Sequence, residues 1–190
     1  MKFPLIIFFL LFLILLSIEG NAQFIIDQSN FENSYGFISY SPQLNNVWQV
    51  GPTTKPFFGS SNSLPNAIMT DTINPYPVNV TSSFIIRSHQ SFGFSGVPNF
   101  TWLDFDHKYQ TSAGHDGGAV EVSYDSINWQ NILLDTLYAN NNYCNTGQTP
   151  SVTNFYNVTD TLYNGQPGFS NQSNGWIHSS VFWCWYLPVA

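Results

Sequence analysis

The chain has 190 residues, of which 8% are charged and 17% aromatic, and its formal net charge at pH 7 is −7. Its four basic residues are too few to neutralise a nucleic-acid backbone or to hold an anionic lipid surface, because both need clustered cations. The composition therefore excludes nucleic acid as a partner. Ordinary soluble domains contain about 25% charged residues, so the polar surface of this chain must consist mainly of amides and hydroxyls.

The first 22 residues are typical of a secretory signal peptide. Lys2 supplies the positive charge, residues 5–16 form an unbroken apolar run, and small residues precede an expected cleavage site before Gln23. The run is shorter than the roughly 20 apolar residues of a membrane-spanning helix, so we expect no membrane span after cleavage. The sequence predicts a secreted or cell-surface protein whose mature part, residues 23–190, is one domain.

Strand signals follow one another along the mature chain, and no segment shows the apolar periodicity of an amphipathic helix. Runs rich in β-branched and aromatic residues, separated by turn-forming residues, occupy positions 24–26, 47–50, 67–70, 83–87, 99–109, 120–125, 129–134 and 176–187. Short strands without crossover helices predict an all-β fold, an antiparallel β-sandwich or barrel.

Residues 99–109 give the clearest alternation of side chains. Since successive side chains of a strand point to opposite faces, one set should face the core and the other should face outward. The inward set is Leu103, Phe105, His107 and Tyr109, and the outward set is Trp102, Asp104, Asp106 and Lys108. We expect Val120 and Val122 to join the inward set in the core.

Two long loops, at residues 110–118 and 139–166, are the expected positions of functional residues. The two cysteines, Cys144 and Cys184, would meet an oxidising compartment after export, which permits a disulfide between them. Such a bridge would stabilise the fold by a few kcal/mol. The alternative is two unpaired thiols, with Cys184 buried in a strand and Cys144 exposed.

Several motifs together resemble a known family. Residues 103–109, followed by 116–125 and Trp129, look like the core hairpin of MAM-like jelly-roll domains in secreted bacterial surface proteins. The segments that extend this resemblance are 48–52, 70–71, 169–170 and 175–176. The resemblance implies a β-sandwich of the concanavalin-like or galactose-binding-like kind, a module of a larger protein exported by the type IX route. It also implies that the domain is incomplete at its C-terminus.

Acidic and aromatic side chains around the predicted hairpin are the candidate binding residues. An indole stacks on the apolar face of a sugar, and carboxylates accept hydrogen bonds from the sugar hydroxyls. Calcium prefers several oxygen ligands, which carboxylates can supply. The predicted ligand-binding set is Trp102, Asp104, Asp106 and Asp116, and the predicted calcium set is Asp104, Asp106, Asp116 and Glu121. The alternative is that these carboxylates are solvated on an outward face. His107 and His115 lack the spacing of a zinc site, and we expect His107 to be a core residue bonded within its strand.

No nucleophile motif is present, so the sequence predicts a non-catalytic recognition or adhesion module whose partner is a glycan or an extracellular protein. Two alternatives stay open. A secreted hydrolase of the glycosidase type would use Asp104 and Asp106, which are roughly 6 to 7 Å apart along a strand. A structural spacer domain would have no binding site.

Overall fold

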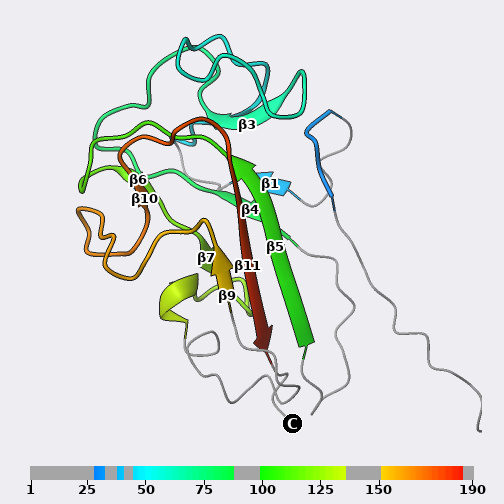
Figure 1. Ribbon diagram of the computed structural model, residues 1–190, viewed down its shortest axis with the longest axis vertical. Helices are drawn as coiled ribbons and strands as arrows, with labels where there is room; N and C mark the ends of the chain where they lie inside the picture. The colour runs from blue at the N-terminus through cyan, green and yellow to red at the C-terminus, as the bar shows by residue number, and fades with distance from the viewer. Residues whose placement is uncertain (1–27, 33–37, 41–44, 88–98, 136–150, 186–190) are drawn as a thin grey trace, which may run out of the picture.

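The computed structural model describes residues 28–32, 38–40, 45–87, 99–135 and 151–185 (Figure 1). Its regular elements are β1 (Ile38–Tyr40), β2 (Trp48–Gly51), β3 (Ala67–Thr70), β4 (Phe84–Ile86), β5 (Asn99–His107), β6 (Gly117–Gly118), β7 (Glu121–Val122), β8 (Gln130–Asn131), the 3₁₀ turn η1 (Ile132–Leu134), β9 (Ser151–Thr153), β10 (Phe169–Ser170) and β11 (Ile177–Trp185). All strand pairs in these ranges are antiparallel, which confirms the predicted all-β class.

The central sheet has three strands in the order β5-β11-β9 (Figure 1). β11 lies in the middle, and its Val181 is paired with Leu103 on one side and with Val152 on the other. Val181 is fully buried. The remaining strands pair two by two, as β1-β4, β2-β3, β6-β10 and β7-β8.

The predicted faces of β5 are confirmed. Residues 102, 104 and 106 are exposed, while 103, 105 and 107 are partly buried. The core consists of the buried side chains of Ile132, Leu133, Tyr156, Val181 and Trp183, with Leu103, Val120, Val122, Phe155 and Phe169 packed against it. The expected core positions 103, 120 and 122 therefore contribute as predicted, and Phe105 lies beside them with its ring 6.3 Å from that of Phe169.

The predicted hairpin between residues 103–109 and 116–125 is wrong. β5 pairs with β11, whereas β6 pairs with β10 and β7 pairs with β8. The strand predicted at 120–125 is cut short after Val122 because the Asp125 carboxylate accepts hydrogen bonds from the backbone N–H groups of Ile127 and Asn128, which forms a tight turn.

The strand predicted at 129–134 is also shorter than expected. β8 ends at Asn131, whose side chain accepts a hydrogen bond from the N–H of Leu133 and so caps η1. The second long loop is not structureless, because β9 lies within it. Strand β1, outside the predicted set, pairs with β4.

A segment between β2 and β3 is tied to the end of the central sheet. The ammonium group of Lys108 donates to the carbonyl of Phe57 at 2.7 Å and lies 4.7 Å from the centre of the Phe57 ring. The indole N–H of Trp176 donates to the carbonyl of Ser60 at 3.2 Å. Lys108 and Trp176 therefore hold this loop beside the beginning of β11.

No helix in the described ranges has the length and apolar content needed to span a bilayer. The predicted signal peptide, residues 1–22, and the strand predicted at 24–26 lie outside the described residues.

Candidate ligand-binding cleft

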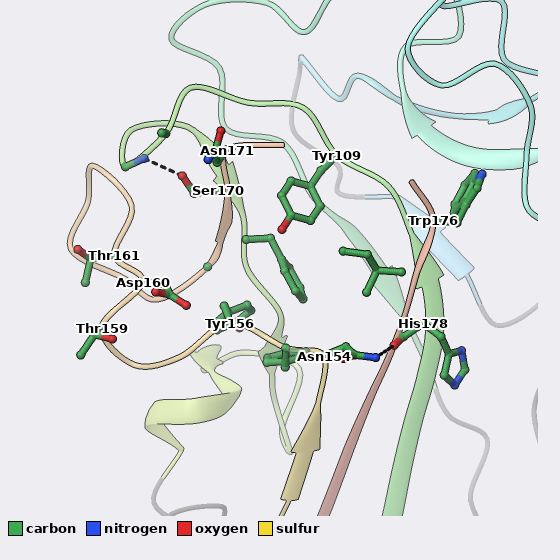
Figure 2. A pocket seen from close by; sticks show the side chains of 16 residues that line it. Tyr109, Asn154, Tyr156, Thr159, Asp160, Thr161, Ser170, Asn171, Trp176 and His178 are labelled. Carbon is green, nitrogen blue, oxygen red and sulfur yellow. Dashed lines mark hydrogen bonds between the residues drawn. The ribbon is translucent and has the colours of Figure 1, made fainter. Parts of the chain in front are cut away.

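A cleft of about 880 Å³ opens where β10, the start of β11 and the loop after β9 meet (Figure 2). Its lining combines aromatic side chains with amides, hydroxyls and one carboxylate. The lining residues are Tyr109, Ala113, Gly114, Asn154, Phe155, Tyr156, Thr159, Asp160, Thr161, Gly168, Phe169, Ser170, Asn171, Trp176, Ile177 and His178. The volume is within the range of small-molecule sites.

The floor of the cleft is a cluster of aromatic rings. The ring of Phe169 lies 5.0 Å from that of Phe155, 4.8 Å from that of Tyr156 and 5.6 Å from that of Tyr109. The Tyr156 hydroxyl accepts a hydrogen bond from the N–H of Val120 and lies 3.2 Å from the carbonyl of the same residue. These contacts fix the Tyr156 ring in the floor, and burial raises the pKa of Tyr156 to about 12, so its hydroxyl stays protonated.

The rim of the cleft is polar. Hydrogen bonds within the protein fix some of its side chains and leave other donors and acceptors unused. The side-chain amide of Asn154 donates to the carbonyl of His178 at 3.0 Å, and the hydroxyl of Ser170 accepts from the N–H of Gly114 at 2.7 Å (Figure 2). Thr159 and Thr161 are exposed beside them. The rim therefore presents ordered hydroxyl and amide groups above an aromatic floor.

Among the polar side-chain atoms of the cleft without a hydrogen-bond partner in the described part of the chain are the hydroxyl of Tyr109 and Oδ1 of Asp160. Oδ2 of Asp160 accepts from the N–H of Asn157 at 2.8 Å. Burial, and to a smaller extent the charge of Asp160, raises the pKa of Tyr109 above its ordinary value. Both groups are available to a ligand.

His107 lies under the floor, and its Nε2 is 2.8 Å from the hydroxyl of Ser179 on β11. That hydroxyl donates its one proton to the carbonyl of Asn154, so Nε2 of His107 is the donor in its bond to Ser179. The expectation that His107 bonds within its own strand is wrong, since its partner is on the neighbouring strand. Burial lowers the pKa of His107 to about 4, which keeps the ring neutral.

We expect the free energy of unfolding to fall by roughly 1 kcal/mol when the pH drops from 7 to 5, a value reduced for the partial exposure of the ring. The folded protein holds the pKa of His107 below the ordinary value of 6.5. The unfolded chain therefore binds the proton more readily, and stability is lost as the pH falls from about 6.5 towards 4.

Urea denaturation of wild type and of His107→Gln at the two pH values measures this effect. The variant should lose most of the pH dependence. His115→Gln, which changes an exposed imidazole in the turn before β6, is the matched control and should keep it. Equal pH dependence in all three proteins would contradict the role given to His107.

None of the predicted ligand-binding residues, Trp102, Asp104, Asp106 and Asp116, lines this cleft. Trp102, Asp104 and Asp106 share the outward face of β5, as predicted. Trp102 is 47% exposed and packs on Phe182, with ring centres 4.7 Å apart. Asp106 pairs with Nδ1 of His178 at 3.0 Å. The outward face of β5 remains a second candidate surface, separate from the lining of the cleft.

The predicted calcium set is not gathered into one site. Asp104 is on β5, Asp116 is in the turn before β6, and Glu121 is on β7. Among the residues that the structure describes, no three His, Cys, Asp or Glu side chains are close enough to hold a metal ion. Gly117, beside Asp116, serves packing instead, because a Cβ at this position would lie 2.1 Å from the carbonyl oxygen of Phe169.

The predicted disulfide lies outside the described residues. Cys144 falls in the range 136–150, and only the backbone of Cys184 is described, opposite Phe100 in the pairing of β5 with β11.

The sequence predicts functional residues in both long loops, but the candidate binding residues named from it include none in the second loop. The signal was Phe155 and Tyr156 followed by the segment 157–161, which is polar except for Val158 and supplies an amide, two hydroxyls and a carboxylate. The remaining side chains of the cleft come from distant segments, near Tyr109 and Phe169, and only the fold brings them to this loop.

Comparison of the chain with protein-family models, with curated proteins and with solved structures found no match, so the resemblance to MAM-like domains stays a prediction.

Proposed function

We propose that the protein is a non-catalytic recognition module of a secreted or cell-surface protein and that it binds a glycan in the cleft. The observation that carries the proposal is the joint presence of an aromatic floor and an amide and hydroxyl rim around one cavity. Aromatic rings stack on the apolar faces of sugars, and rim groups of this kind exchange hydrogen bonds with sugar hydroxyls. Export and the MAM-like jelly-roll sandwich are part of the same proposal.

The carboxylates of the described residues favour binding over hydrolysis. Glycosidases act with two carboxyl groups on either side of the scissile bond, whereas the described lining of the cleft contains one, that of Asp160. The pair considered from the sequence, Asp104 and Asp106, is on the outward face of β5, and Asp106 is bonded to His178. This arrangement supports a module that holds its ligand without cleaving it.

A glycan array probed with wild type, Tyr109→Phe and Tyr163→Phe tests the proposal. Tyr109→Phe removes a hydroxyl that has no partner among the described residues, and it should weaken binding roughly three- to tenfold, the value of one net hydrogen bond. The melting temperature should stay the same. Tyr163 is 86% exposed and does not line the cleft, so the identical change there should leave binding unchanged.

Trp102→Ala distinguishes the cleft from the outward face of β5. Full binding by this variant agrees with the cleft, whereas loss of binding in Trp102→Ala together with full binding in Tyr109→Phe would move the site to β5. Absence of binding to every glycan on the array would contradict the proposal and favour a protein partner or a spacer.

A further inference from the structure

We propose that the cleft selects uncharged glycans and that Asp160 is the residue that discriminates against acidic sugars. This inference rests on the proposed function. It adds the chemical class of the ligand and names the side chain that determines it.

The positive charges of the described chain are directed away from the cleft. Lys108 is bonded to the carbonyl of Phe57, and the ammonium of Lys55 is bonded to the carbonyl of Thr70 at 2.6 Å. Arg87 follows β4 and does not line the cleft. Figure 2 shows the imidazole of His178 on the far side of its strand from Asp160. A bound carboxylate or sulfate would therefore find no cationic partner among the described lining residues.

Asp160 is fixed in position on the opposite side of the cleft. Its Oδ2 accepts from the backbone N–H of Asn157 at 2.8 Å and from the side-chain amide of Asn157 at 3.2 Å. Its backbone carbonyl accepts from the N–H of Gly168 at 2.9 Å. These bonds hold the carboxylate at the rim and leave Oδ1 free to accept a hydrogen bond from a sugar hydroxyl. The negative charge of the carboxylate strengthens such a bond.

The hydroxyl of Tyr109 complements this acceptor, because it can both donate and accept. Asp160 and Tyr109 together suit the neutral hydroxyls of a sugar ring. An anionic group placed about 6 Å from the Asp160 carboxylate would instead be repelled, and binding would weaken on the order of tenfold. The net charge of −7 on the whole chain acts in the same direction.

The test compares neutral oligosaccharides with their uronic acid counterparts, which differ only at C6. The probes are immobilised oligomers of glucose, galactose and mannose and the corresponding oligomers of glucuronic, galacturonic and mannuronic acid. Wild type should bind at least one neutral oligomer, and its acidic counterpart about tenfold more weakly. Asp160→Asn, which retains an oxygen for the Asn157 bonds, should bring the two affinities within about threefold of each other.

Asp104→Asn is the matched control, since it removes the same charge from the outward face of β5 and should leave the wild-type ratio unchanged. Equal or tighter binding of acidic oligomers by wild type would overturn the inference while leaving glycan binding intact. A ratio unchanged by Asp160→Asn would overturn the role of Asp160. Failure of wild type to bind any of the six oligomer types, or any glycan on the array, would remove the proposed function and this inference with it.

Discussion

Replacement of Gly117 by alanine is expected to lower the free energy of unfolding by about 3 kcal/mol, the upper end of the usual cost of overpacking. A Cβ at this position would lie 2.1 Å from the carbonyl oxygen of Phe169 and 2.5 Å from Cδ2 of Leu162. The oxygen belongs to the backbone of β10, so it cannot move without disturbing the β6-β10 pair. The backbone φ of Gly117 is not left-handed, and space alone requires glycine there.

Gly118→Ala is the matched control, because a Cβ on Gly118 would meet nothing within 4 Å. The same substitution one residue later should leave stability unchanged or raise it by up to about 1 kcal/mol, since alanine restricts the unfolded chain. Urea denaturation of the two variants measures the difference. Equal stabilities would contradict the close approach of β6 and β10. Because Phe169 is part of the floor of the cleft, Gly117→Ala should also weaken glycan binding.

The Gly117-Gly118 pair illustrates what sequence could and could not show. A pair of glycines is typical of a place where another group approaches the backbone closely, and Gly117 is such a place. The approaching group is the backbone of β10, not a cation or ligand bound by Asp116. A glycine in a sequence can indicate that a neighbouring group lies close to the backbone, but it does not identify that group.

Strand positions and faces could be predicted where alternation extends over several residues. The nine-residue strand β5 is an example of both, whereas for the nine-residue β11 the position was predicted, and Val181, Phe182 and Trp183 are all buried. Their partners could not be predicted in the same way, because alternation shows which face is buried and contains no information about the neighbouring strand. The pairing of Leu103 with Val181 joins segments far apart in sequence, and the resemblance of 103–125 to a hairpin favoured a local partner instead.

The shortest strands gave no usable signal. β6 and β10 have two residues each, and β9 has three, which is too few for periodicity to be recognised. β9 pairs with the nine-residue β11, whereas β6 and β10 pair with each other, and in both cases tertiary packing brings the strands together. The cleft is formed by β10 and by the loop after β9. The loop could therefore be recognised in the sequence, but the set of residues that forms the site could not.

Residues 132–134 provide the sharpest test of the local fold. In the strand predicted at 129–134, Ile132 and Leu133 would point to opposite faces, and only one of them would be buried in the core. In the 3₁₀ turn η1 both are buried, with exposed fractions of 1% and 9%, while Leu134 is 47% exposed. The two geometries therefore predict different patterns of stability across three neighbouring alanine variants.

We expect Ile132→Ala and Leu133→Ala each to lower the free energy of unfolding by about 2 to 5 kcal/mol, because both open a cavity in the core around Val181 and Trp183. Leu134→Ala should cost less than about 1 kcal/mol, as should Ile127→Ala, which is 79% exposed in the preceding turn. Urea denaturation monitored by tryptophan fluorescence gives the four values. If Ile132→Ala and Leu134→Ala lower the free energy of unfolding strongly and Leu133→Ala does not, the segment alternates as a strand does. That result would contradict η1 and support the strand predicted from the sequence.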